Sequence, residues 1–389
     1  MPTAVAAAPD FARMKRELAE LVAIRSENPP GREIEAALYV RDRLAPLGFE
    51  IALDEYKPGR VNIEAKLVNG PGPVFALNTH MDVVPAGGGW SSDPFVLRES
   101  DGKLYGRGAC DCKGPLAAML EAMRMLASER ATWSGTLLAV FVADEEIASE
   151  GAKLYASRKP KIDFTVVGEP TSNTVYSAHK GSLRPLVRVL GVPAHSGSPH
   201  LGENAILHAG ELLGLVAEQH ERDVRHRTHP LVGGASLTVT RIYGGHADNV
   251  LPGACEMLLD RRLVPGEDEA AVKADIAAML ALAHERFGLR AEIVEWKPTT
   301  GGATETAPDR PIVLASLATC RAHGIAEPGP FGFQGACDLV HFRSTGAEGV
   351  VIGPGTLSVA HKADEFVPVD EFEMSSLIYR DIAKAMLTG

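Results

Sequence analysis

Acidic side chains and imidazoles occur at five separate points of the sequence, each at the end of a predicted strand. The five segments are Thr79-His80-Met81-Asp82, Ala109-Cys110-Asp111-Cys112-Lys113-Gly114, Asp144-Glu145-Glu146, Gly168-Glu169-Pro170 and Ala360-His361. Carboxylates gathered in one place raise one another's pKa values, because like charges resist ionising together. A divalent cation supplies the missing positive charge, and imidazole with carboxylate is a donor set that suits zinc. Together the five segments predict a metal site.

Each segment has an ordinary explanation when it is taken alone. A single histidine is more often a surface or core residue than a ligand, and a carboxylate at the start of a loop commonly caps a helix. Convergence favours chemistry instead. The carboxyl ends of strands in an open α/β sheet share one edge, where ligands bind. We therefore expect the five segments to meet in one cleft.

The elements that position these segments alternate between helices and strands. Helical periodicity covers residues 11–24 and 32–47, stops between them at Asn28-Pro29-Pro30-Gly31, and returns at 113–127. Short buried strands are predicted at 49–53, 73–79, 135–143 and 164–167. The last three lead directly into acidic or imidazole segments. Strands that alternate with helices predict an α/β sheet.

The pattern changes at about Ser182. A strand, a helix, two strands, a helix and a strand are predicted at 182–190, 204–220, 236–243, 254–262, 269–287 and 290–296. This β-α-β-β-α-β order is that of a ferredoxin-like unit. The α/β pattern then returns at 312–323, 350–353 and 370–387. We expect a catalytic α/β domain with a mixed, mostly parallel sheet, formed by 1–180 and 297–389 and interrupted by a ferredoxin-like α+β domain at 181–296.

Length and charge limit the class of protein and partner. A chain of 389 residues is too long for one ordinary core, which predicts two domains. Lys and Arg number 39 against 50 for Asp and Glu, and this acidic balance argues against nucleic acid or an anionic membrane as a partner. No apolar run is long enough to cross a bilayer, and the first residues lack the features of a signal peptide. We predict a cytoplasmic protein.

The cysteines do not indicate a disulfide framework. Their number is odd and they are scattered, which suits a reducing compartment. We expect each of them to be buried and inert, at Cys110, Cys112, Cys255, Cys320 and Cys337. The sequence also shows no nucleophilic motif such as G-x-S-x-G.

The whole chain, from the first predicted helix to the last, resembles one known family. This is the metallopeptidase family of acetylornithine deacetylase, succinyl-diaminopimelate desuccinylase, the aminoacylases and carboxypeptidase G. The stretches that carry the resemblance are Asn78-Thr79-His80-Met81-Asp82-Val83-Val84-Pro85, Gly106-Arg107-Gly108-Ala109-Cys110-Asp111-Cys112-Lys113-Gly114, Asp144-Glu145-Glu146, Gly168-Glu169-Pro170-Thr171, and Gly353-Pro354-Gly355 leading to Ala360-His361.

The resemblance implies a site for two divalent metal ions. Zinc is the implied metal, with cobalt or manganese as alternatives. One ion would be bound by His80, Asp111 and Glu169. The other would be bound by Asp111, Glu146 and His361. Asp111 would therefore bridge the two ions.

The resemblance also assigns the neighbouring acids. Asp82 would orient the His80 imidazole, and Glu145 would be the general base. The implied reaction is hydrolysis of a C–N bond, in particular the amide of an N-acyl amino acid. Bound metal would lower the pKa of water, while Glu145 would take its proton and deliver it to the leaving nitrogen. A cis peptide between Asp111 and Cys112 is implied as well.

The inserted domain resembles the lid of the family, which also pairs subunits into a homodimer. The matching stretches are 191–196 and 199–206. The resemblance implies that His195 reaches the site of a neighbouring subunit; alternatively, it only caps the loop before the helix that starts at Asn204. Asn249 and Arg262 match positions that contact substrate, and a guanidinium can pair with both oxygens of a carboxylate. The alternative for Arg262 is an ion pair on the surface of a strand.

Two residues depart from the family pattern, and two alternative functions stay open. Cys112 stands where Met or Asp is common, and Pro115 where Gly is frequent, so the walls of the site differ from the usual pattern. The first rival function is hydrolysis of another C–N bond, in a dipeptide, a carbamoyl compound or an aromatic amine, because the pocket selects the substrate. The second is a non-catalytic homologue that only binds a ligand, since a fold does not fix a function.

Overall fold

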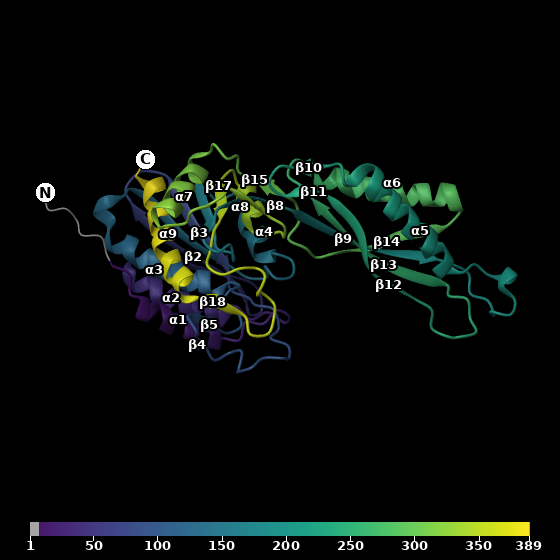
Figure 1. The fold of residues 1–389 in the computed structure, drawn as a ribbon, viewed down its shortest axis with the longest axis horizontal. Coiled ribbons are helices and arrows are strands. Elements are labelled where there is room, and N and C mark those ends of the chain that lie inside the picture. Colours follow the sequence, from purple (N-terminus) through teal and green to yellow (C-terminus); the bar gives the residue numbers. More distant parts are fainter. Residues whose placement is uncertain (1–7, 389) are drawn as a thin grey trace. The chain divides into compact units, whose positions relative to one another are not determined.

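The computed structural model describes residues 8–388 and divides them into two compact units (Figure 1). Unit 1 runs to Ser177 and resumes over Thr306–Phe331 and from Cys337 onwards. Unit 2 is formed by Ala178–Glu305 and Gly332–Ala336. The domain boundaries expected at 180/181 and 296/297 stay predictions.

Unit 1 is built on a mixed sheet. In sheet order, its strands are β1 (Glu50–Lys57), β2 (Arg60–Asn69), β6 (Gly135–Val142), β3 (Val74–His80), β7 (Phe164–Val167) and β17 (Glu348–Val351). β3 is parallel to β6 and β7, and β7 is parallel to β17, whereas β1 and β2 are antiparallel to their neighbours. β8 (Tyr176–His179) begins beside β17 and carries the chain into unit 2.

Helices cover both faces of this sheet. They are α1 (Phe11–Ala23), α2 (Ile34–Leu44), α3 (Lys113–Ser128), α4 (Glu150–Ser157), α7 (Pro311–Ala322), α8 (Leu339–Ser344) and α9 (Val369–Leu387). Phe75 and Leu77 of β3 face the core that α1, α2, α3, α7 and α9 share, whereas Ala76 faces the core of α4 and α8. Burial on both faces explains why the central strands are continuous apolar runs.

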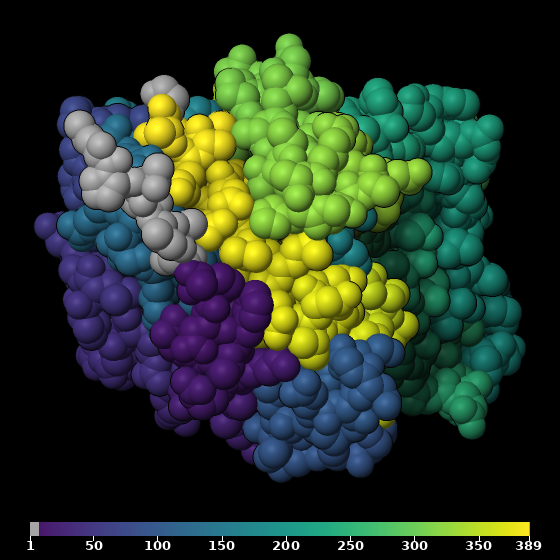
Figure 2. Space-filling model, turned by 60° about the vertical axis from the view of Figure 1, so that its left-hand side comes forward, coloured from purple at the N-terminus to yellow at the C-terminus, as the bar shows by residue number. Residues whose placement is uncertain are grey.

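The two ends of unit 1 lie side by side. Figure 2 shows C-terminal residues, in yellow, between the N-terminal helices in purple and the region of α7 in green. Nζ of Lys15 in α1 lies 3.7 Å from Oε1 of Glu373 in α9. Short elements complete the unit: η1 (Ala45–Leu47), η2 (Arg130–Thr132), and a sheet of β18 (Phe366–Pro368), β5 (Lys103–Tyr105) and β4 (Arg98–Ser100).

Strand register brings the carboxyl ends of four strands to one edge. His80, the last residue of β3, pairs with Val142 at the end of β6. Asn78 pairs with Val167 at the end of β7, and β17 ends beside β7 at the same level. The loops that follow these strands therefore leave the sheet together, as the sequence predicts for a ligand-binding edge.

Unit 2 has the predicted β-α-β-β-α-β order. Its antiparallel sheet runs β12 (Ser236–Gly244), β13 (Ala254–Leu263), β9 (Gly181–Leu190) and β14 (Arg290–Lys297), with a core shared by α5 (Ala205–Gln219) and α6 (Glu269–Phe287). Shorter elements are η3 (Pro199–Leu201), η4 (His220–Val224), β10 (Thr228–His229), β11 (Gly233–Gly234) and β15 (Thr304–Glu305), while β16 (Phe331–Phe333) begins at the last residue of a unit 1 segment. The predicted fold class is confirmed in both units. Within residues 8–388, no helix has the length and apolar character needed to span a membrane.

Candidate metal centre

The five predicted metal ligands meet in unit 1, at the edge where β3, β6 and β7 end. His80 ends β3, Glu146 follows β6, and Glu169 follows β7. Asp111 precedes α3, and His361 lies in the loop after β17. The side-chain donor atoms form two groups, and within each group all of them lie within 4.8 Å of one another.

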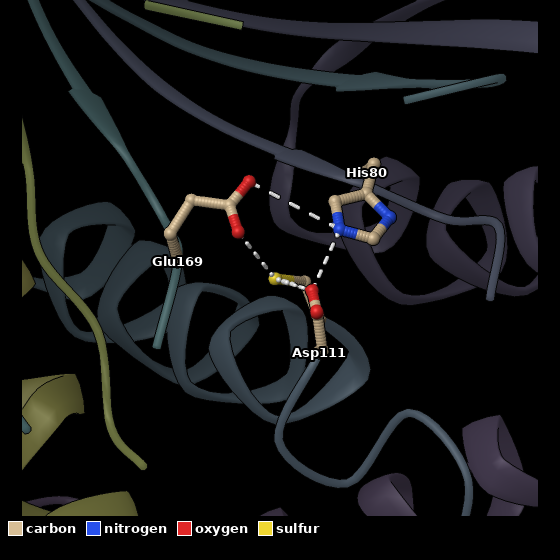
Figure 3. Close-up of side chains that lie close together, drawn as sticks. His80, Asp111 and Glu169 are labelled. Atoms are coloured by element: carbon tan, nitrogen blue, oxygen red, sulfur yellow. Dashed lines mark hydrogen bonds and ion pairs between the residues drawn. The ribbon is translucent and has the colours of Figure 1, made fainter. Parts of the chain in front are cut away.

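The first group, called here the buried set, consists of His80, Asp111, Cys112 and Glu169 (Figure 3). His80 Nε2 lies 3.1 Å from Asp111 Oδ1 and 4.0 Å from Glu169 Oε1. Cys112 Sγ lies 3.0 Å from Asp111 Oδ1 and 3.3 Å from Glu169 Oε2. All four residues are buried. Cys112 was not among the predicted ligands, so the sequence missed one member of this group.

The second group, called here the loop set, consists of Asp111, Glu146 and His361. His361 Nε2 lies 3.2 Å from Asp111 Oδ2 and 2.9 Å from Glu146 Oε2. Asp111 thus presents one oxygen to each set. Glu146 Oε1 is buried and has no hydrogen-bond partner among the described residues. A buried oxygen without a partner is costly, and this one fits a site that receives a cation.

The centre contains more acidic than basic side chains. Burial, together with the charge of Glu169, raises the pKa of Glu145 well above its usual range. Burial likewise raises the pKa of Glu169 to about 8. Burial opposes ionisation of Asp111 too, but hydrogen bonds from His361 and His80 hold its pKa well below the usual range. Imidazole, carboxylate and thiol donors with this excess of acid fit divalent cations.

Asp82 contacts both His80 and the loop that follows β6. His80 Nδ1 lies 2.9 Å from the backbone oxygen of Asp82 and 3.5 Å from its carboxylate. The buried Asp82 carboxylate accepts hydrogen bonds from the backbone N–H groups of Glu145 and Glu146, at 3.1 and 3.3 Å. Asp82 therefore contacts both the imidazole and the loop that carries Glu145, the predicted general base.

A buried amide extends this support. Asn28 Nδ2 donates to Asp82 Oδ2 at 2.8 Å and to Asp144 Oδ1 at 2.9 Å. Arg60 Nη2 lies 2.7 Å from the same Asp144 oxygen, and Arg60 Nε lies 2.9 Å from Glu33 Oε2. Sequence reasoning used Asn28 only as part of a helix stop. The Asn-Pro-Pro-Gly stretch was the one signal that marked the position.

A second buried carboxylate holds the backbone before α3. Glu365 Oε1 accepts hydrogen bonds from the N–H groups of Cys110 and Asp111, both at 3.0 Å. The other Glu365 oxygen pairs with the buried Arg107. Glu365 comes four residues after His361, so one loop supplies a candidate ligand and the residue that holds Asp111. The peptide between Asp111 and Cys112 is cis, which confirms what the resemblance implied.

Two glycines allow the loops of the centre to approach closely. A Cβ atom on Gly114 would lie 2.3 Å from the carbonyl oxygen of Ala109, and one on Gly353 would lie 2.4 Å from that of Glu169. Both distances are far below contact, so only glycine permits these approaches. They explain why glycine follows the Asp111 segment and precedes the loop of His361.

The other three predicted site residues belong to unit 2. His195 is exposed, and its Nδ1 accepts a hydrogen bond from the N–H of Gly197 at 3.0 Å. Asn249 is also exposed. Arg262 donates from Nε to Asp260 Oδ1 at 2.7 Å, so the ion pair considered as the alternative for this residue is present. Their predicted contacts with substrate stay predictions.

Comparisons with known proteins agree with this arrangement. Residues 76–385 match Peptidase family M20/M25/M40. A probable succinyl-diaminopimelate desuccinylase of Staphylococcus epidermidis is 30% identical, over 96% of this chain and 97% of its own. An acetylornithine deacetylase of Vibrio vulnificus is 31% identical, over 93% and 94%. Among solved structures, an M20 family metallo-carboxypeptidase of Sulfolobus solfataricus has a TM-score of 0.80 at 20% identity, over 96% and 99%. A dinuclear metal-binding M20 peptidase of Bacillus subtilis has a TM-score of 0.73 at 18% identity, over 97% and 98%.

Proposed function

We propose a function from one premise: the chain belongs to peptidase family M20/M25/M40, a family of metal-dependent hydrolases. Membership confirms the resemblance seen in the sequence. The proposed function is dinuclear, metal-dependent hydrolysis of a C–N bond, in particular deacylation of a small N-acyl amino acid. The observation that carries it is the pair of donor sets that share Asp111. The desuccinylase and deacetylase names of the relatives support the choice of an acyl group.

The ligands fall into two groups of three. His80, Asp111 and Glu169 would hold one ion, and Asp111, Glu146 and His361 the other. Zinc suits imidazole and carboxylate donors, with cobalt and manganese as alternatives. When bound, the two ions lower the pKa of water and polarise the carbonyl of the substrate.

The residues of the chain handle the proton. Glu145 takes a proton from the attacking water and delivers it to the leaving nitrogen. Its partly buried position next to the candidate ligand Glu146 supports this role. Asp82 accepts hydrogen bonds from the backbone N–H groups of Glu145 and Glu146. This arrangement leaves the Glu145 side chain for proton transfer and the adjacent Glu146 side chain for metal binding.

Metal removal tests this proposal. Protein treated with a chelator should lose turnover and regain it with zinc, cobalt or manganese. Circular dichroism of the chelated protein is the control, since the loss must not come from unfolding. Full activity in protein shown to be free of metal would overturn the proposal.

The choice of substrate needs a separate experiment. Dipeptides, carbamoyl compounds and aromatic amides are alternatives, because the same water and base can attack each of them. Values of kcat/KM for N-acetyl, N-succinyl and N-formyl amino acids should exceed those for dipeptides and aromatic amides. Metal bound without turnover of any member of the panel would favour a non-catalytic binding protein.

We also propose a homodimer in which unit 2 is the lid and the pairing domain. Two open sheet edges, β12 and β14, support it, as do exposed apolar residues on β12 and α5. These residues are Ile206, Leu207, Ile242 and Tyr243. The cytoplasmic location, and the absence of nucleic acid or membrane as a partner, stay predictions.

His195 would complete the site of the partner subunit by donating a hydrogen bond to the tetrahedral oxyanion. Its exposure supports this role, and Asn204 itself caps α5 by accepting from the N–H of Ile206. Inactive Glu145→Gln and inactive His195→Ala subunits should regain partial activity when they are co-assembled. No rescue in verified heterodimers would exclude action across the interface.

A further inference from the structure

We infer that Cys112 is a fourth donor to the ion that His80, Asp111 and Glu169 would hold, so that this ion binds nitrogen, oxygen and sulfur. The inference rests on the proposed metal site and extends it. The sequence predicted a buried, inert cysteine at this position. The side chain is buried, but its sulfur points into the centre of the buried set.

The position of the sulfur carries the inference. The sulfur lies 3.0 Å from Asp111 Oδ1 and 3.3 Å from Glu169 Oε2, and Figure 3 shows the labelled side chains of His80, Asp111 and Glu169 pointing toward one another. The Asp111 oxygen that lies 3.0 Å from the sulfur is also the one that lies 3.1 Å from His80 Nε2. All four donors lie within 4.8 Å of one another, so they surround a single space.

A hydrogen bond from the Cys112 thiol cannot serve both neighbouring carboxylates, those of Asp111 and Glu169. A thiol has one proton and can donate it to only one of the two carboxylates at a time. The oxygen of the other carboxylate then lies beside a sulfur lone pair, 3.0 Å away for Asp111 or 3.3 Å away for Glu169, which is unfavourable even though Asp111 also contacts His80 and His361. A divalent cation contacts every donor at once. The unpartnered buried oxygen of Glu146 in the loop set independently indicates that the centre receives cations.

The backbone holds Cys112 in this position. The carbonyl oxygen of Cys112 accepts the first hydrogen bond of α3, from Leu116 at 3.1 Å. Glu365 fixes the two preceding N–H groups, those of Cys110 and Asp111. Cys110, two residues away and equally buried, directs its sulfur instead to the carbonyl oxygen of Thr356 at 3.6 Å. Cys110 is therefore a matched control.

A sulfur donor would make the two ions unequal. Thiolate is a softer ligand than carboxylate and favours zinc or cadmium over manganese. The buried set would then prefer zinc, while the loop set, with nitrogen and oxygen donors only, would accept manganese as well. On binding, the thiol proton leaves to solvent and the sulfur binds as thiolate.

Cobalt substitution tests the inference. Protein loaded with two equivalents of Co²⁺ should show a near-ultraviolet sulfur-to-cobalt charge-transfer band. Cys112→Ser should lose the band, and Cys110→Ser should keep it. Cys112→Ser should also lower the zinc affinity of one site by about tenfold or more. Cys112→Asp should lose the band and favour manganese.

The possible failures are distinguishable. Protein that binds no cobalt would overturn the proposed function together with this inference. Protein that binds two equivalents without the band, or a band unchanged in Cys112→Ser, would overturn the inference alone. X-ray absorption at the zinc edge of the wild-type protein needs no variant, so it settles the matter if Cys112→Ser does not fold. A sulfur neighbour at about 2.3 Å is expected, and a shell of nitrogen and oxygen alone would overturn the inference.

Discussion

The two donor sets differ in how the fold supports them. Every residue of the buried set is shielded from solvent, and His80 ends a strand that is covered on both faces. In the loop set, the side chain of His361 is 54% exposed, and its backbone φ is 63°. The core of unit 1 thus fixes one half of the centre, whereas a surface loop completes the other half.

This difference separates two tasks. The residues of the buried set are packed with the sheet, so changing them should affect both folding and metal binding. The side chain of His361 is 54% exposed, so changing it should affect metal binding far more than folding. The centre therefore combines a rigid part, which orients the ligands, with an accessible part, through which ions could exchange.

The largest effect is expected from Glu145, the proposed general base, which is the neighbour of Glu146 in the sequence. Glu145→Gln should lower kcat by about 10²–10⁴-fold while metal content stays near two equivalents, because the base is lost and the ligands are kept. Glu146→Gln is the matched neighbour and should lose the ion of the loop set. Metal analysis and steady-state kinetics check both variants. Metal loss in the first and retention in the second would mean that the two roles are reversed.

Histidine substitutions test the difference in support directly. In metal-free protein, His80→Ala should lower the free energy of unfolding by about 3–5 kcal/mol, because it removes the buried imidazole that contacts the buried carboxylates of Asp82 and Asp111. His361→Ala should lower it by about 1 kcal/mol or less, because the imidazole side of its ion pairs is 54% exposed and water can replace it beside the two buried carboxylates. Urea unfolding of both variants measures the contrast. Equal losses would show that the loop is as much part of the core as the strand.

The support behind Asp82 should give a smaller effect. Asn28→Ala leaves Asp82 and Asp144 without a shared donor and should cost about 1–3 kcal/mol of unfolding free energy. Asn62→Ala is the control, because Asn62 is equally buried but bonds only to backbone groups of Ala143 and Gly151. Both variants should be destabilised, but only Asn28→Ala should also lower kcat. An unchanged kcat in Asn28→Ala would show that the amide has a purely structural role.

The smallest effect concerns pH in the metal-free protein. Hydrogen bonds to Asp111 and Glu146 raise the pKa of His361 to about 10, against about 6.5 when it is unfolded. The stabilisation from this pairing is fully present below about pH 6.5 and is lost as the pH rises through about 10. The difference in Tm between wild type and His361→Asn should therefore shrink over that range. A difference that grows with pH would contradict the pairing.

The sequence determined much of the fold. The order of unit 2 and the central strands β3, β6 and β7 follow from local apolar patterns. An element that is buried on one face has periodic apolar residues, whereas a strand that is buried on both faces is a continuous apolar run. β2 was missed because polar residues interrupt its pattern, and among them Asn62 is buried through bonds to distant backbone. The short helices α4 and α8 have too few turns to show a period.

The sequence also determined the candidate ligands. Acids and imidazoles at strand ends, with the family resemblance, picked out His80, Asp111, Glu146, Glu169 and His361, and the structure brings them together. They could be proposed from the sequence because each motif is local and its residues lie close together in the chain.

Only the tertiary structure decided what surrounds the ligands. Asn28 meets Asp82 across 54 residues, and Glu365 meets Cys110 across 255, so no local pattern marks these contacts. The sequence likewise placed Cys112 beside Asp111 but could not tell which way its sulfur points. Its position depends on Glu365, which holds the N–H groups of Cys110 and Asp111, and on the packing of Glu169, in the loop after β7, near the start of α3. Spacing along the chain specifies which residues reach an edge, whereas packing between segments distant in sequence specifies which atoms meet there.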